Sequence, residues 1–136
     1  MDHVAILKKS WKQKILSGEK MIESRWYKAK VAPWDRINAG DVVYFKESGE
    51  QVSVKAGVEK VLQFADLSEE KIKEILTVYG NRIGVGDSFF EKVKNKRYCI
   101  LVFLRDVEEI KPFNINKAGF GTMAAWLCGD ITHLKR

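Results

Sequence analysis

The sequence predicts a single domain of the α+β class, residues 1–136, in which strands dominate and helices are inserted between them. Apolar and polar residues alternate over 52–58, and residues 98–104 are almost continuously apolar, as in a strand buried on both faces. Apolar residues recur at helical spacing over 72–79, which indicates a helix with one core-facing stripe. An apolar fraction of 46% argues against a disordered chain.

The first elements are a strand over 3–7 and a helix over 10–17. Ser10 is expected to cap this helix, because Gln13 stands three residues later in the capping-box position. Gly18 occupies the place of a left-handed C-cap. A second strand is expected to begin within two residues of Gly18.

The segment 26–36 mixes cations and aromatic residues, and Pro33 prevents a regular hydrogen-bonded ladder there, so a loop is expected. A turn at 38–41 leads into a strand over 42–46, and residues 48–50 form a hairpin turn before the long strand over 52–61. The alternation shifts near Lys60, which predicts a β-bulge near Gly57.

The second half is expected to begin with a helix that Ser68 caps and that Gly80 and Asn81 end. Residues 84–86 are expected to form a turn, and Ser88, with Glu91, is expected to cap a short helix. The strand over 98–104 continues into a segment over 105–110 in which apolar and polar residues alternate. Residues 113–121 form a second irregular segment, and 123–127 fit either a helical turn or a short strand.

Three charged residues, Lys20, Glu23 and Arg25, stand close together at the start of the second strand. Side chains alternate between the faces of a strand, so Glu23 and Arg25 share one face with Met21, while Ile22, Ser24 and Trp26 take the core face. Lys20 has the wrong parity and can join Glu23 only from the preceding turn or across a bulge. A carboxylate between two cations should have a lowered pKa and stay ionised.

The same residues carry a family resemblance. Gly18, Lys20, Glu23 and Arg25 match the Gly-x-Lys-x-x-Glu-x-Arg signature, and the segment resembles the ASCH domain, a branch of the PUA-like β-barrels. The strand and helix before it, and the Pro-Trp-x-Arg-Ile-x-x-Gly-Asp segment at 33–41 after it, are also similar to that family. The resemblance is clearest over 3–64 and implies a PUA-like barrel of five or six strands with helices packed outside.

The resemblance also implies an RNA-related function. The expected activity is that of a module that binds single-stranded or modified nucleotides in a basic cleft at the barrel mouth. The polar floor of this cleft would be Lys20, Glu23 and Arg25, and its rim would be Tyr27, Lys28, Lys30, Trp34 and Arg36. Aromatic faces stack on bases, and Lys or Arg contacts phosphate, so this composition suits unstacked nucleotides.

The net charge of +6 favours polyanionic partners, RNA or nucleotides among them, although a basic surface without such a partner is an equal alternative. Lys20, Glu23 and Arg25 have an alternative too: an internal ion-pair network that completes the barrel rim. The parity of Trp26 favours a place inside the barrel, and Trp34 could equally well plug the barrel or bind bases.

Two other functions compete with nucleic-acid binding. Some small ASCH-type proteins are amidohydrolases that deacetylate N4-acetylcytidine with a Lys, a Thr three residues later and a distant Glu. Here Lys20 aligns with the Lys, but Glu23 replaces the Thr, so only acid–base work by Lys20 and Glu23 would remain. A protein-interaction module is the further alternative. The sequence therefore favours a binding protein over an enzyme.

No cofactor and no metal are expected, because His3 and His133 lie at opposite ends of the chain and no acidic cluster has ligand spacing. Cys99 and Cys128 lack zinc-like spacing, and Cys99 is expected to be a small buried residue. No signal peptide and no membrane span are expected, and a reducing, cytoplasmic compartment follows. The oligomeric state is left open.

Overall fold

The computed structural model describes residues 1–121 and 124–136, and over these the chain forms six strands and four helices. In chain order they are β1 (Asp2–Leu7), α1 (Trp11–Ser17), β2 (Ile22–Tyr27), β3 (Val42–Glu47), β4 (Val52–Phe64), α2 (Glu69–Ile83), α3 (Phe89–Val93), β5 (Tyr98–Phe113), β6 (Trp126–Cys128) and α4 (Ile131–Leu134). The α+β class predicted from the sequence is confirmed.

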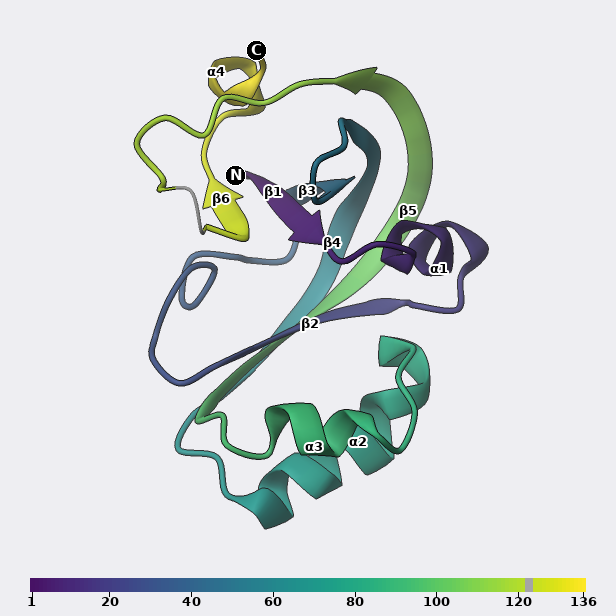
Figure 1. Cartoon of the computed structure of the whole chain (residues 1–136), viewed down its shortest axis with the longest axis vertical. Coiled ribbons are helices and arrows are strands. Elements are labelled where there is room, and N and C mark those ends of the chain that lie inside the picture. The colour runs from purple at the N-terminus through teal and green to yellow at the C-terminus, as the bar shows by residue number, and fades with distance from the viewer. Residues whose placement is uncertain (122–123) are drawn as a thin grey trace.

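The strands form one curled sheet in the order β2-β5-β4-β3-β1-β6 (Figure 1). Only the β1–β3 pair is parallel among the described strands; the other pairs are antiparallel. The long strands β4 and β5 curl together, and their register shifts between Lys55 and Gly57 and again between Val58 and Lys60. The bulge predicted near Gly57 is therefore present, and bulges of this kind give a sheet the curvature that a barrel needs.

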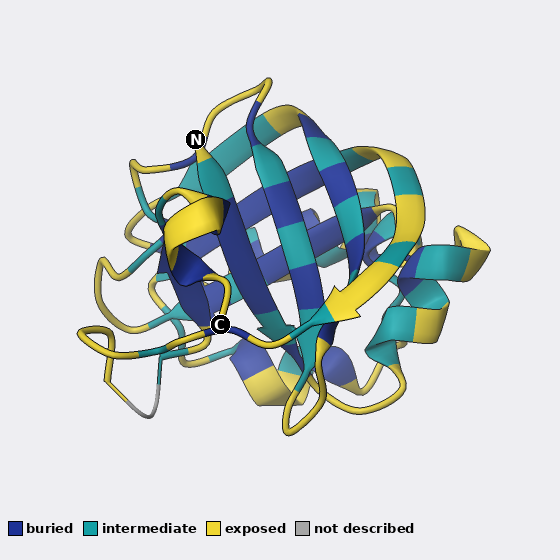
Figure 2. Ribbon diagram, turned by 90° about the horizontal axis from the view of Figure 1, so that it is seen from above, coloured by how far each residue is buried: buried dark blue, intermediate teal, exposed yellow. Residues whose placement is uncertain are grey.

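The core lies on both faces of the sheet. Phe45, Val54 and Val102 belong to a cluster on the inner face, whereas Leu101 and Phe103 belong to a cluster that α2 and α3 cover. Both helices lie together on one side of the sheet, and α4 lies at the opposite end (Figure 1). Figure 2 shows that the buried segments concentrate in the strands. Successive β5 residues face different clusters, which explains the continuous apolar run at 98–104.

The predicted caps are partly right. Ser68 accepts a hydrogen bond from the Lys71 amide and caps α2 as predicted, and Gly18 ends α1 at φ 83°. The prediction for Ser10 is wrong: this residue has φ 79° and its side chain makes no cap bond. The carboxylate of Glu47, at the end of β3, instead accepts a hydrogen bond from the Lys12 amide at 3.2 Å.

Two further boundaries differ from the prediction. The helix α2 does not end at Gly80 but continues to Ile83, with Gly84 as its left-handed C-cap. Ile83 is fully buried in the cluster under α2, and this packing outweighs the cost of about 1 kcal/mol that a glycine adds inside a helix. Ser88 precedes α3, but its side chain makes no cap bond.

The irregular segments fall largely where they were expected. Residues 28–41 contain turns but no strand, with a cis peptide bond before Pro33. Of the ambiguous segment 123–127, Met123 lies outside the described residues, and Trp126 and Leu127 belong to β6. Among the described helices, none is both long and apolar enough to cross a membrane.

Candidate functional site

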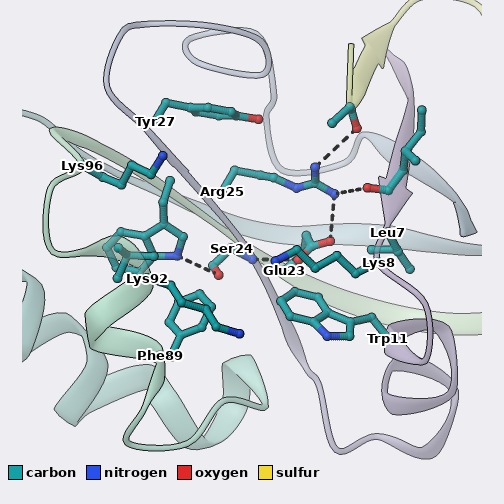
Figure 3. A pocket seen from close by; sticks show the side chains of 14 residues that line it. Leu7, Lys8, Trp11, Glu23, Ser24, Arg25, Tyr27, Phe89, Lys92 and Lys96 are labelled. Carbon is teal, nitrogen blue, oxygen red and sulfur yellow. Dashed lines mark hydrogen bonds and ion pairs between the residues drawn. The ribbon is translucent and has the colours of Figure 1, made fainter. Parts of the chain in front are cut away.

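A pocket of about 380 Å³ opens at the seam where the free edge of β2 approaches the end of β1 (Figure 3). One wall comes from the end of β1 and from Trp11 of α1, and the other comes from Phe89 and Val93 of α3. The strand β2 runs between the two walls and contributes five consecutive residues, 23–27. Because β2 is an edge strand, side chains from both of its faces reach the pocket.

Glu23 is the centre of a buried ion-pair network beside this pocket. Its Oε1 lies 3.2 Å from the Lys20 Nζ, and its Oε2 lies 3.1 Å from an Arg25 guanidinium nitrogen. The Ser24 amide also donates a hydrogen bond to Oε1 at 3.0 Å. Burial raises the pKa of Glu23, but the two cations and their hydrogen bonds outweigh burial and hold this pKa below its ordinary value. The carboxylate is therefore ionised at neutral pH.

Lys20 joins Glu23 from the turn before β2, as its parity requires, but it is sealed off from the pocket. Its side chain is 1% exposed, donates to the Ile83 carbonyl at 3.0 Å and lies 4.4 Å from the centre of the Trp11 ring. Burial is the largest influence on the pKa of Lys20 and lowers it, although Glu23 opposes the shift. Among the described residues that line the pocket, Lys20 is not included. The ammonium group therefore supports Glu23 from behind.

Arg25 closes the seam. Its guanidinium donates to the Ile6 carbonyl of β1 at 3.1 Å and to the Ala125 carbonyl before β6 at 3.4 Å, in addition to its bond with Glu23. The side chain also lies 5.1 Å from the centre of the Trp126 ring. One planar cation with several donors thus joins the two free sides of the curled sheet. Its side chain stays 12% exposed and faces the pocket.

The other β2 residues complete the pocket floor. The Ser24 hydroxyl oxygen accepts a hydrogen bond from the Trp26 indole at 2.9 Å, and the Trp26 ring meets Phe89 edge-on at 6.2 Å. Trp26 is thus part of the core under α3, as its parity predicted. Tyr27 is half-buried and lines the pocket; burial raises its pKa, so its hydroxyl is protonated at neutral pH.

Three lysines outside the predicted cleft surround the pocket. Lys8 follows β1, Lys92 lies on α3, and Lys96 lies in the turn after it. Figure 3 shows Lys92 and Lys96 on the α3 side and Lys8 with Trp11 on the opposite side. The spacing of Lys92 and Lys96 would place them on one helical face, but no pattern in the sequence connects α3 with residue 8 or β2.

Four of the predicted rim residues lie elsewhere. Among the described residues, the pocket lining does not include Lys28, Lys30, Trp34 or Arg36, which belong to the loop after β2. Trp34 is half-buried and meets Tyr98 edge-on at 5.2 Å, and Lys30 lies 5.9 Å from the centre of that Tyr98 ring. Lys28 and Arg36 are exposed. Glu23, Arg25 and Tyr27 thus line the pocket, and Lys20 contacts Glu23 from outside it. The rest of the predicted rim lies on the loop after β2.

The site contains a single acid among its described lining residues, Glu23, and this acid already contacts two cations. Within residues 1–121 and 124–136, no group of three or more His, Cys, Asp or Glu side chains comes together in a way that could hold a metal ion. The described lining residues offer a ligand aromatic contact, hydrogen bonding and attraction of anions.

Comparisons with known proteins identify the fold. No family model matches the chain, and no curated protein matches its sequence. The crystal structure of ASCH from Zymomonas mobilis is 16% identical and matches with a TM-score of 0.72 over 97% of this chain and 90% of that chain. A Tyr-to-Phe variant of the same protein matches with a TM-score of 0.71 over 99% of both chains. A crystal structure of the hypothetical protein PH0355 is 20% identical, with a TM-score of 0.51 over 81% of this chain and all of that chain.

Proposed function

We propose that this chain, an α+β domain with the fold of ASCH proteins, binds RNA or nucleotides through unpaired bases in the pocket at the β2 seam. One observation carries the proposal: a pocket with an apolar and aromatic lining has three lysines at its mouth, Lys8, Lys92 and Lys96. An anionic group attached to a flat, apolar ring fits such a site, and a nucleotide has both parts.

Each part of a nucleotide has a matching group in the pocket. Trp11 and the apolar side chains of α3 offer surface for a base, because aromatic faces stack on bases of any sequence. The lysines at the mouth attract phosphate as point charges. Glu23 is buried and holds Arg25 in place, so Arg25, whose side chain is partly exposed, is the charged group of the floor that a ligand can reach.

The arrangement supports binding over amide hydrolysis. Lys20, the residue that aligns with the lysine of the amidohydrolases, is enclosed by the Ile83 carbonyl, Glu23 and the Trp11 ring. Its ammonium would have to leave this enclosure to reach a substrate in the pocket. Glu23 occupies the place of the threonine, so no hydroxyl nucleophile stands beside Lys20 in that position.

The test is the binding of a fluorescein-labelled single-stranded RNA, followed by fluorescence anisotropy at several salt concentrations. Affinity should fall as salt rises, with a log–log slope of roughly −0.7 for each phosphate contacted. The Lys92→Ala/Lys96→Ala double variant should weaken binding and make the slope shallower by about 1.4, the value for two contacts. Lys111→Ala, which removes an exposed lysine of β5 away from the pocket, is the matched control and should leave both quantities unchanged.

Absence of binding at low salt, or binding that salt does not weaken, would refute the proposal. A protein partner that competes with the RNA, or that still binds the double variant, would support an interaction module instead.

A further inference from the structure

A second basic surface begins at the mouth of the pocket and leads away from it. The end of β2 and the start of β5 lie side by side, because Tyr27 pairs with Tyr98 and the Arg97 amide donates to the Tyr27 carbonyl at 2.9 Å. The residues that follow Tyr27 therefore lie next to those that follow α3. Lys96 and Tyr27 belong to both places, since they also line the pocket.

Four cations define this surface, which we call the basic track: Lys28, Lys30, Lys96 and Arg97. In the part of the chain that the structure describes, none of the four forms an ion pair with an acid. Lys94, in the same turn as Lys96, differs from them because it pairs with Glu91 at 2.8 Å. The positive charge of the track is thus unneutralised and faces solvent at Lys28, Lys30 and Arg97.

Aromatic rings lie among these cations. The Lys30 ammonium is 5.9 Å from the centre of the Tyr98 ring, and Trp34 meets the same ring edge-on at 5.2 Å. Trp34 and Tyr98 are both half-buried, so part of each ring stays accessible. A surface of charge alone would attract any polyanion, but aromatic rings between the cations favour a single strand whose bases are unstacked.

We infer that the basic track binds the backbone phosphates of a single-stranded RNA several nucleotides long, one nucleotide of which enters the pocket. The inference rests on the proposed function and adds the class of ligand: an oligonucleotide, in preference to a free mononucleotide. The pocket holds one unit, and the track supplies additional phosphate contacts next to it. Affinity and salt dependence should therefore both grow with the length of the strand.

The test compares four ligands under identical conditions: the mononucleotide 5′-AMP by competition, and single-stranded RNAs of three, six and nine nucleotides. Wild-type affinity should rise from the mononucleotide to the six-nucleotide strand and then level off. The Lys28→Ala/Lys30→Ala/Arg97→Ala triple variant should bind the six-nucleotide RNA on the order of tenfold more weakly, with a salt slope shallower by about 2. The same variant should bind 5′-AMP as the wild type does, because its three substitutions lie outside the pocket.

Two controls separate the contributions. Lys94→Ala removes a lysine that is neutralised by Glu91 and should leave the six-nucleotide affinity unchanged. The Lys92→Ala/Lys96→Ala variant removes two cations at the pocket and should weaken the binding of all four ligands. Circular dichroism confirms that each variant is folded, and Lys30→Glu, a single exposed change, provides the same test should the triple variant be unstable.

The outcomes distinguish the two proposals. The proposal for the basic track is refuted if the six-nucleotide RNA binds no more tightly than 5′-AMP, or if the triple variant binds this RNA as tightly as the wild type does. Either result leaves the proposed function of the pocket standing. Absence of binding for every ligand overturns both. Polyglutamate of equal charge binding as tightly as the six-nucleotide RNA would overturn the assignment to nucleic acid.

Discussion

At the scale of single residues, Glu23 has almost no exposed surface and contacts two cations, Lys20 and Arg25. Removing charges from water costs several kcal/mol per ion, and mutual attraction offsets that cost only when geometry and hydrogen bonding are good. Here every charged group has a further partner, among them the Ser24 amide for Glu23 and the Ile83 carbonyl for Lys20. The network is therefore sensitive to the loss of any one member.

Lys20→Met should destabilise the fold by about 3–5 kcal/mol, because it leaves the buried Glu23 carboxylate with one cation instead of two. Urea denaturation monitored by tryptophan fluorescence measures the loss. Lys9→Met is the matched control: Lys9 is exposed, and its replacement should change the free energy of unfolding by less than about 0.5 kcal/mol. Equal stability of the two variants would show that the network contributes little.

A second buried polar chain runs through His3. Its Nε2 lies 2.9 Å from Asp41, and its Nδ1 accepts a hydrogen bond from the Trp126 indole at 3.0 Å. The Met1 ammonium contacts the same Asp41, and Asp2 adds a further negative charge nearby. Accepting at Nδ1 requires the neutral ring with its proton on Nε2. Burial is the largest influence on the pKa of His3 and lowers it, against the opposing influence of Asp41.

The protein should therefore lose stability as the pH falls below about 6.5, the ordinary pKa of histidine in an unfolded chain. In that range the unfolded chain binds a proton at residue 3 that the folded protein takes up only at lower pH. The pKa of Asp41 is also lowered, so the contribution of Asp41 to the free energy of unfolding is lost at more acidic pH. Urea midpoints at pH 7.5 and pH 5.0 measure the effect. His3→Gln cannot titrate, and a wild-type decrease no larger than that of His3→Gln would contradict the expectation.

At the scale of secondary structure elements, β2 differs from an ordinary edge strand because both of its faces are buried. Ile22 and Trp26 face the cluster under α2 and α3, and Glu23 faces the ion-pair network. The Ser24 amide donates its hydrogen bond to the Glu23 carboxylate. The edge of β2 therefore has one free backbone donor fewer with which a strand of another chain could pair. The edge is thus closed by side chains instead of by a further strand.

The helices α1 and α2 begin differently although a serine precedes each of them. Ser68→Ala should destabilise the protein by about 1 kcal/mol, because it removes the bond that the Lys71 amide donates. Ser10→Ala removes no cap bond and should stay within about 0.5 kcal/mol of wild type. Thermal unfolding of the two variants side by side measures the difference, and equal losses would show that Ser10 does cap α1.

At the scale of the whole molecule, the side chain of Arg25 bridges the seam of the curled sheet. The two ends of the strand order, β2 and β6, are joined through Arg25, which donates to the Ile6 and Ala125 carbonyls. Ile6 and Ala125 also bond to each other through the backbone at 2.9 Å. The pocket lies beside this junction, so the closure of the sheet and the shape of the pocket depend on the same guanidinium.

Arg25→Lys keeps the positive charge beside Glu23 but cannot reach both carbonyls, because an ammonium lacks the planar fork of donors. Amide hydrogen exchange at Ile6 should become roughly tenfold faster or more, in line with the loss of a charge-assisted hydrogen bond. Exchange at Leu101, in the centre of β5, should change little. Arg105→Lys, at an exposed arginine of β5, is the control and should leave Ile6 unaffected. Unchanged exchange at Ile6 in Arg25→Lys would mean that the Arg25 guanidinium adds little to holding β1 at the seam.

Local patterns were sufficient for most of the fold. The strands β1, β3 and β4, the bulge near Gly57 and the cap at Ser68 were each predicted from residues close together in sequence, and all are present. The convergence of Lys20, Glu23 and Arg25 was also predictable, because alternation in a strand and the preceding turn depend on local geometry. The end of α2 was not predictable in this way, because the Gly80-Asn81 pair is a local stop signal, whereas the packing of Ile83 that extends the helix involves distant segments.

The sequence by itself determined the α+β class, the order of the main elements and the charged trio on β2, since periodicity and spacing are local properties of the chain. Only the tertiary structure decided which members of that trio reach solvent. Lys20 is sealed by a carbonyl 63 residues away and by a ring on α1, and Lys92 and Lys96 reach the pocket only because α3 packs beside β2. Burial and pocket lining depend on contacts between distant segments, and no local pattern encodes them.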